Sequence, residues 1–219
     1  MRNNNYREWS QLMKYSSRKQ EKELYSTSLK PQFVEVPEQK FFSLHGVGDP
    51  NGAEFKEKME TLFPMAYALK AAYKKYCENK TVEFDDYVVF PLEGVWSLTE
   101  EGQAMDQLDK DEFEYDVMIR IPDFVPDDLI EPTIQATKEK KHLKLLPQLE
   151  IKTYPAISAI QILHVGPYDD EPTSFTKMDQ LLEENSKQRV SKSHREIYLS
   201  DARRVDADKL QTILRYEIN

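Results

Sequence analysis

Cysteine and long apolar runs are scarce in this chain, and each shortage excludes a class of protein. A single cysteine among 219 residues, Cys77, rules out an internal disulfide framework and is typical of a reducing compartment. No apolar run approaches the roughly 20 residues that a membrane-spanning helix requires. The first five residues lack the apolar core of a signal peptide. We therefore expect a cytoplasmic protein that has no membrane partner.

Positive charge is also in short supply. The chain carries 30 Lys and Arg residues against 39 Asp and Glu residues, for a formal net charge of −9. A phosphate-binding surface needs an excess of Lys and Arg, so this balance argues against direct binding of nucleic acid. Hydrophobic residues, by contrast, make up 39% of the chain. That content is enough to fill the core of one large domain or of two fused halves.

The standard catalytic motifs are missing as well. The chain has no Gly-x-Ser-x-Gly elbow and no Walker loop. Gly46-Val47-Gly48 begins like a dinucleotide-binding fingerprint but has no third glycine at the required spacing. The four histidines show no zinc-ligand spacing with carboxylates or cysteine, so we expect neither a metal ion nor another cofactor. Cys77 has no evident activating base and is interpreted as a packing residue.

Apolar periodicity and turn residues predict the order of the elements. Helices are expected over residues 6–25, 53–76, 126–144 and 173–186. Strands are expected over residues 32–36, 40–44, 87–96, 115–121, 148–153, 156–164, 195–199 and 210–218. Pro64 is expected to kink the second helix or to split it in two. Pro91 favours a bulge or an edge position for the third strand.

The order strand, helix, strand, strand occurs twice, and two short stretches also line up. Residues 44–48 correspond to 162–166, and residues 93–97 correspond to 196–200. We therefore predict an α+β fold made of duplicated strand-helix-strand-strand units. Its antiparallel sheet would carry two long helices on one face, with a pseudo-two-fold axis and a groove between the halves. The expected boundaries are an N-terminal helical arm at 1–30 and a domain at 31–219, with halves at 31–122 and 147–219 around a spacer helix at 126–146.

One chemically informative stretch is residues 161–168. It is an apolar strand that stops at a Gly-Pro-Tyr turn. The run Asp169-Asp170-Glu171-Pro172 that follows, three acidic residues and a proline, suits the start of a helix.

A second informative stretch is the strand at 195–199. Alternation places His194, Glu196 and Tyr198 on one face of the sheet. A carboxylate flanked by aromatic rings suits a flat or cationic organic molecule, because the rings stack and the charge is neutralised. The simpler interpretation is a half-exposed strand that carries a solvated glutamate and a partly exposed histidine.

The alignment of the halves makes Glu93 the counterpart of Glu196, which would bring two carboxylates together near the pseudo-axis. A carboxylate in an apolar cage has a raised pKa unless a cation accompanies it. Either glutamate is therefore a candidate cation receptor or general acid/base. The candidate catalytic residues are Glu196, Glu93 and Tyr198. The candidate ligand-binding residues are Glu93, Trp96, Tyr67, His164, Tyr168, His194, Glu196 and Tyr198.

Two motifs resemble those of a known family. His164-Val165-Gly166-Pro167-Tyr168 before a helix, together with the run at 196–201, resembles the GyrI-like small-molecule-binding domain. This family includes effector-binding domains of multidrug-responsive transcription regulators and stand-alone gyrase inhibitory proteins. The runs at 35–42, 91–96 and 194–201 are similar to the stand-alone subgroup in particular. The resemblance extends from about Pro31 to Ile218.

The resemblance implies both a fold and a chemistry. The family fold is a duplicated strand-helix-strand-strand unit, and its members bind hydrophobic cations with a sheet glutamate and surrounding aromatic rings. Glu196 occupies the matching position here. Some stand-alone members hydrolyse cyclopropane-bearing DNA-alkylating natural products within an aromatic cage. The regulators carry a DNA-binding region before this domain, and no such pattern precedes Pro31, so direct DNA regulation is not expected.

Three functions stay open at this stage. The protein could sequester flat, hydrophobic, often cationic xenobiotics in an aromatic cage. It could use the same cage to hydrolyse cyclopropane-bearing DNA-alkylating compounds for self-protection. It could instead be an acidic macromolecular inhibitor of a nucleic-acid enzyme, of the gyrase inhibitory type. The sequence names neither the natural ligand nor the oligomeric state.

Overall fold

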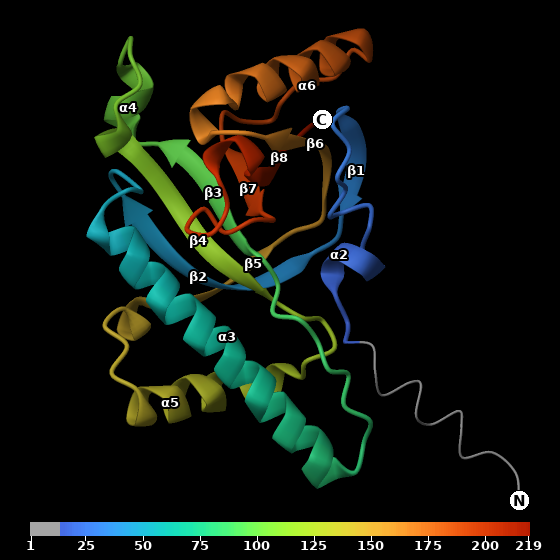
Figure 1. The fold of residues 1–219 in the computed structure, drawn as a ribbon, viewed down its shortest axis with the longest axis vertical. Coiled ribbons are helices and arrows are strands. Elements are labelled where there is room, and N and C mark those ends of the chain that lie inside the picture. Colours follow the sequence, from blue (N-terminus) through green and yellow to red (C-terminus); the bar gives the residue numbers. More distant parts are fainter. Residues whose placement is uncertain (1–13) are drawn as a thin grey trace, which may run out of the picture.

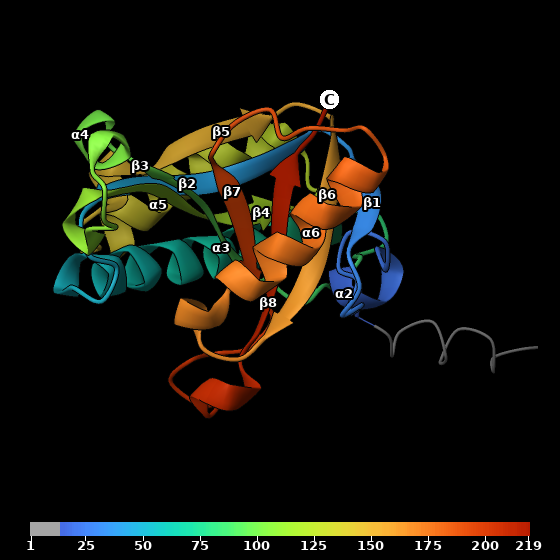
Figure 2. The same ribbon diagram turned by 90° about the horizontal axis from the view of Figure 1, so that it is seen from above.

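Eight strands form one curled antiparallel sheet in the computed structural model, which describes residues 14–219 (Figures 1 and 2). The strands are β1 Gln32–Val36, β2 Gln39–Val47, β3 Leu92–Leu98, β4 Phe113–Ile121, β5 Glu150–Tyr154, β6 Ile157–Val165, β7 His194–Tyr198 and β8 Gln211–Glu217. Their order across the sheet is β1-β6-β8-β7-β3-β4-β2-β5. The predicted α+β class with an antiparallel sheet is confirmed.

The helices connect these strands. They are α2 Ser17–Gln20, α3 Ala53–Lys80, α4 Glu100–Ala104, α5 Ile130–Lys140 and α6 Pro172–Glu184. Five short 3-10 turns add η1 Lys110–Glu112, η2 Asp127–Leu129, η3 Leu146–Gln148, η4 Tyr168–Asp170 and η5 Ala207–Lys209. Among the described residues, no helix combines the length and the apolar character that crossing a membrane requires.

The longest helix, α3, runs without a break through Pro64, so the prediction that this proline could split it was wrong. A proline in a helix interior removes one backbone hydrogen bond and crowds the preceding turn. Leu62 and Met65, on either side of Pro64, are fully buried in the main core. Their packing against the sheet compensates for the lost hydrogen bond and keeps the helix continuous.

The N-terminal arm is less helical than predicted. Residues 6–13 lie outside the described part of the chain, and within residues 14–25 only the four residues of α2 form an α-helix. Tyr15 instead pairs in extended form with Tyr87, and its backbone oxygen accepts a hydrogen bond from the Val88 N–H at 2.8 Å. This pairing also explains why the strand expected over 87–96 begins only at Leu92, because the segment before Pro91 pairs with the arm.

The strand register assigns the two faces of the sheet. One row of facing residues crosses six strands and consists of Leu44, Val117, Gly94, Glu196, Leu214 and Ile162. At one end of the row, α3 packs on β2 and β4 and shares a core with Leu44 and Val117. At the other end, α6 buries Met178 and Leu182 against Leu214 and Ile162. The two long helices therefore cover the same face (Figure 1).

The strand order is symmetric. If β1 is matched with β5, β2 with β6, β3 with β7 and β4 with β8, the order read from one edge matches the order read from the other. The edge strands cross over, since β1 pairs with β6 and β5 pairs with β2. The two central strands, β3 and β7, pair with each other. The centre of the sheet, between α3 and α6, is therefore where β3 and β7 present their side chains together.

Candidate functional site

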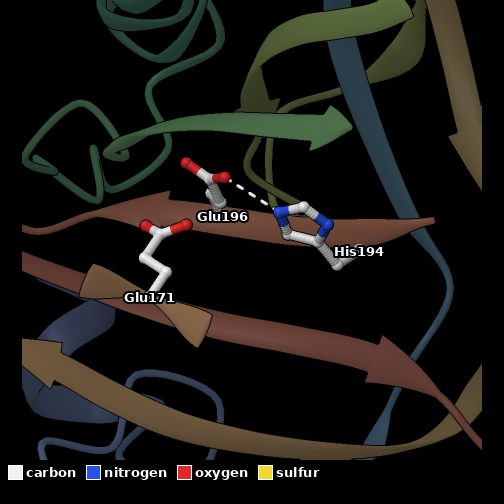
Figure 3. A group of neighbouring side chains, drawn as sticks. All are labelled: Glu171, His194 and Glu196. Atoms are coloured by element: carbon white, nitrogen blue, oxygen red, sulfur yellow. Dashed lines mark hydrogen bonds and ion pairs between the residues drawn. The ribbon is translucent and has the colours of Figure 1, made fainter. Parts of the chain in front are cut away.

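Three side chains of β7 and one of β3 form the centre of this face. His194, Glu196 and Tyr198 alternate along β7 as the sequence predicted, and Trp96 lies opposite His194 in the ladder. His194 Nε2 lies 2.9 Å from Glu196 Oε1 (Figure 3). The Trp96 indole N–H donates to the Tyr198 hydroxyl oxygen at 2.9 Å. Burial first, and the Glu196 carboxylate second, hold the pKa of Tyr198 well above its usual range, so its phenol keeps its proton.

Aromatic rings surround these polar groups. Trp96, which is only 6% exposed, has the ring of Tyr115 at 4.7 Å between centroids and the ring of Phe55 stacked at 6.2 Å. On the other side, Tyr168 meets Tyr198 edge-on at 6.1 Å. Phe175 of α6 meets His194 at 4.9 Å. The predicted aromatic side chains of β3, β7 and η4 are thus brought together, and α3 and α6 add two more rings.

Glu171, at the entrance to α6, is a site residue that the sequence reasoning missed. It was interpreted as one of four residues that start a helix, yet its carboxylate points toward Glu196 and His194 (Figure 3). One ligand-type atom from each of the three side chains lies within 4.8 Å of the others. Its spacing of three residues from Tyr168 is the signal that could have found it, because one helical turn returns a side chain to the same side.

The environment of Glu171 is unusual for a carboxylate. Its side chain is buried, with 7% of the residue exposed, and its Oε1 has no hydrogen-bond partner. Burial first, and the Glu196 carboxylate second, raise the pKa of Glu171 to about 9. At neutral pH this group therefore carries its proton, because two neighbouring buried carboxylates cannot both ionise without a cation.

His164 fixes the turn that delivers Glu171 and Tyr168. Its Nδ1 lies 3.0 Å from the Ser174 hydroxyl of α6, and its Nε2 lies 3.0 Å from the Pro167 carbonyl oxygen. Gly166, which lies between His164 and Pro167 in the sequence, has φ +133°. Residues other than glycine rarely adopt this conformation. His164, a candidate ligand-binding residue, lies on the face of Glu196, because it pairs with Thr212, which in turn pairs with Tyr198. Both of its ring nitrogens are engaged by the turn, so its place in the structure is that of a positioning residue.

Glu93 lies on the opposite face of the sheet, which corrects the expectation that the two glutamates converge. In the ladder Glu93 faces Ile197, and it is Gly94 that faces Glu196. A shift of one residue turns a strand side chain to the other side of the sheet. Glu93 is 1% exposed, and its Oε2 lies 3.6 Å from the guanidinium of Arg195.

Tyr67, the remaining candidate, lies on α3 with 57% of its surface exposed. It takes part in none of the aromatic contacts that surround Trp96 and Tyr198. The structure therefore does not bring Tyr67 to the group around Glu196.

Charge balance is the main chemical property of the group. Within residues 14–219, the only ion pair that Glu171 or Glu196 makes is the one between Glu196 and His194. Among the described residues, Glu171, His194 and Glu196 are also the only three such side chains close enough to surround a metal ion. The expectation that the protein binds no metal therefore stays a prediction, because these three side chains offer three ligand atoms. The group offers buried negative charge, aromatic faces and no Lys or Arg partner.

The fold and this group define a class of protein: an antiparallel α+β domain that buries acidic and aromatic side chains beneath two helices. The family profile of the GyrI-like small molecule binding domain matches residues 29–217. The chain therefore belongs to the GyrI-like family of small-molecule-binding domains, and the resemblance seen in its sequence is confirmed.

Solved structures with the same fold include two proteins from Listeria innocua. An uncharacterised conserved protein is 30% identical, with a TM-score of 0.80, and the match covers 94% of this chain and 100% of that one. A hydrolase is 29% identical, with a TM-score of 0.77 and the same coverage. The C-terminal domain of EcmrR shares the fold at 15% identity and a TM-score of 0.51, with 87% and 97% covered. None of the curated proteins matches this chain.

Proposed function

We propose that this protein binds flat, hydrophobic, positively charged small molecules at Glu196. The observation that carries the proposal is a buried carboxylate pair, Glu171 and Glu196, that lies among aromatic rings and has no Lys or Arg partner among the described residues. Two buried carboxylates that share only His194 as a basic partner in this part of the chain are costly. An organic cation removes that cost, and its flat surface stacks on Trp96, Tyr168 and Tyr198.

Ligand entry requires a movement of side chains, because the site is filled by its own rings. Trp96 and Glu196 are both buried, whereas Tyr168 is 40% exposed and lies at the outer edge against Tyr198. Tyr168 lies on the short turn η4, so we expect it to rotate outward at smaller cost than a ring held by the sheet. We assign Tyr168 as the side chain that opens the site.

Glu196→Gln tests this proposal, with a rigid aromatic cation and a neutral analogue of the same shape as ligands. The substitution removes the charge and keeps the size. We expect cation affinity to fall by about 1.5–3 kcal/mol, while the neutral analogue, held by stacking, loses much less. Glu150→Gln, at an exposed position of β5, is the matched control and should change neither affinity. Equal losses for both ligands would show that Glu196 is not a charge receptor.

We further propose that the bound molecule is hydrolysed when it carries an activated cyclopropane. The support is the 29% identity to a hydrolase from Listeria innocua over the whole of that chain. Opening a cyclopropane that is conjugated to a carbonyl requires an oriented water and a hydrogen-bond donor to the carbonyl oxygen. In this proposal Glu196 orients the water, and Tyr198, whose phenol keeps its proton, donates to the oxygen.

Measuring turnover distinguishes the proposed hydrolysis from sequestration of the compound alone. An activated cyclopropane should be opened over many cycles, and mass spectrometry should find no covalent adduct on the protein. Tyr198→Phe should lower turnover more than binding, since it removes the donor and keeps the ring. One equivalent bound, with no product above the uncatalysed rate, would mean that the protein only binds this compound.

The net charge of −9 favours a second candidate, an acidic inhibitor that engages a nucleic-acid enzyme directly. A gyrase supercoiling assay distinguishes this macromolecular inhibitor from the small-molecule-binding protein. Inhibition that persists in Glu196→Gln would assign the effect to the surface charge, whereas inhibition that is lost would assign it to the small-molecule site.

We also infer that residues 31–122 and 147–219 are duplicated halves related by a pseudo-two-fold axis. The strand order, which reads alike from both edges, supports this. Superposition of β2-α3-β3-β4 on β6-α6-β7-β8 is the test, and β3 and β7 in unrelated positions after superposition would contradict it.

A further inference from the structure

Glu171 and Glu196 come from different elements and meet without a Lys or Arg partner, and His194 is the only basic side chain that pairs with either of them among the described residues. Glu171 approaches from the turn before α6, and Glu196 approaches from β7. Each is more than nine-tenths buried, and Glu171 Oε1 is completely covered by protein and has no hydrogen-bond partner. An ionised carboxylate can only accept hydrogen bonds, whereas a protonated one can also donate to the carboxylate beside it.

We propose that Glu171 and Glu196 together hold one proton when the site is empty, and that an entering organic cation displaces this proton into solvent. This inference rests on the proposed function, because it states how the same site distinguishes cations from neutral molecules. The step is balanced: the Glu171 carboxyl group loses a proton to the buffer, and the ligand's positive charge takes its place between two carboxylates.

The surrounding groups favour this exchange. From β7, His194 Nε2 lies 2.9 Å from Glu196 Oε1, and the raised pKa of Tyr198 keeps its phenol neutral. From η4, Asp169 adds a further negative charge near Glu171, and Tyr168 has its pKa raised to about 12, by burial first and by Glu196 second. No Lys or Arg in residues 14–219 forms an ion pair with either carboxylate. Within that range His194 pairs with Glu196 alone, so the positive charge that Glu171 needs comes from a proton or from the ligand.

Proton release gives the cation a pH-dependent affinity that a neutral ligand lacks. Below the pKa of Glu171, which is about 9, the cation must displace the proton before it can pair with the second carboxylate. One displaced proton means that affinity rises about tenfold per pH unit in that range and then levels off. A neutral analogue leaves the proton in place, so its affinity should be constant over the same range.

Calorimetry in several buffers measures the proton directly. The heat of binding of the aromatic cation at pH 7 is plotted against the ionisation enthalpy of each buffer, and the slope is the number of protons released. We expect about one proton per cation for the wild-type protein and none for the neutral analogue. Glu150→Gln is the matched control and should release the same proton as the wild type.

Glu171→Gln separates this inference from a general effect on the pocket. The amide imitates the protonated carboxyl group and cannot lose its proton. The variant should still bind the cation at pH 7 through Glu196, release no proton, and show no rise in affinity toward pH 9. If the wild type binds the cation with the same heat in every buffer, the inference is wrong and the binding function stands.

Infrared spectroscopy of the ligand-free protein tests directly whether the carboxylate pair holds a proton. A protonated carboxyl group gives a C=O stretch that an ionised carboxylate lacks, and this band should disappear in Glu171→Gln or on addition of the cation. If the wild type binds no cation at any pH, the proposed function fails, while the band still decides whether the pair holds a proton. If the band is missing at pH 7 in the wild type, the proton is not there and the inference is overturned.

Discussion

At the scale of single residues, alternation along β7 separates two kinds of charge. Glu196 projects toward α6 and the aromatic rings, whereas Arg195, its neighbour in the sequence, projects to the other face and pairs with Glu93. Glu196 therefore remains available to a ligand because of its place in the alternation of the strand.

Glu171 lowers the stability of the folded protein at neutral pH. Its pKa rises from 4.5 to about 9 on folding, so above pH 4.5 the unfolded chain releases a proton that the folded protein retains. Stability contributed by this residue is therefore lost as pH rises from 4.5 toward 9, and it is constant outside that window. At pH 7 the cost is on the order of 3 kcal/mol.

We accordingly expect Glu171→Gln to stabilise the protein. Urea unfolding should show a gain of up to about 3 kcal/mol at pH 7 and almost no gain at pH 4, where the wild-type group is protonated in both states. Glu150→Gln should give no gain at either pH. A gain of equal size at both values would mean that packing and not ionisation is the cause.

At the scale of elements, a glycine in β3, next to β7, makes room for the indole of Trp96. Gly94 faces Glu196 across the ladder, and a β-carbon added at Gly94 would lie 2.5 Å from Trp96 Nε1. The missing side chain thus lets the indole lie over β3 and reach the Tyr198 hydroxyl.

Gly94→Ala should displace the indole and break its hydrogen bond to Tyr198. We expect affinity for the cation and for its neutral analogue to fall together, by about 1–3 kcal/mol, because both stack on the displaced ring. The Trp96 indole N–H signal in an NMR spectrum should shift. Ser97→Ala, on the same strand and the other face, serves as the control. A cation-selective loss would contradict this role for Gly94.

The sequence predicted the site residues correctly where a single strand determines which face a side chain occupies. The period of two in residues 195–199 placed His194, Glu196 and Tyr198 correctly, because alternation is a property of the strand itself. Glu93 was misplaced because the two halves were aligned by residue identity. Alternation within β3 sets Glu93 and Trp96, three residues apart, on opposite faces, and the register with β7 gives Trp96 the face of Glu196. Glu171 was missed because its contact with Glu196 arises only when the turn before α6 folds over β7.

At the scale of the whole molecule, the second face of the sheet holds the N-terminal arm. Arg120 reaches Glu21 and Asp123, and Arg215 donates to the Leu24 carbonyl oxygen. Burial first, and Arg195 second, lower the pKa of Arg215 to about 10, which still leaves it charged at neutral pH. The arginines on this face therefore fasten the segment after α2, while the carboxylates on the other face remain without such partners.

Glu21→Gln should loosen this attachment without affecting the small-molecule site. Arg120 has only 3% of its side chain exposed, and loss of a partner leaves a buried charge partly unpaired. Because Asp123 remains, we expect a loss of about 1–3 kcal/mol in urea unfolding. Asp123→Asn, whose carboxylate is 66% exposed, should cost less than about 1 kcal/mol. Affinity for the aromatic cation should be unchanged in both variants, since Glu196 lies on the opposite face. A fall in that affinity with Glu21→Gln would show that the two faces are coupled through the sheet.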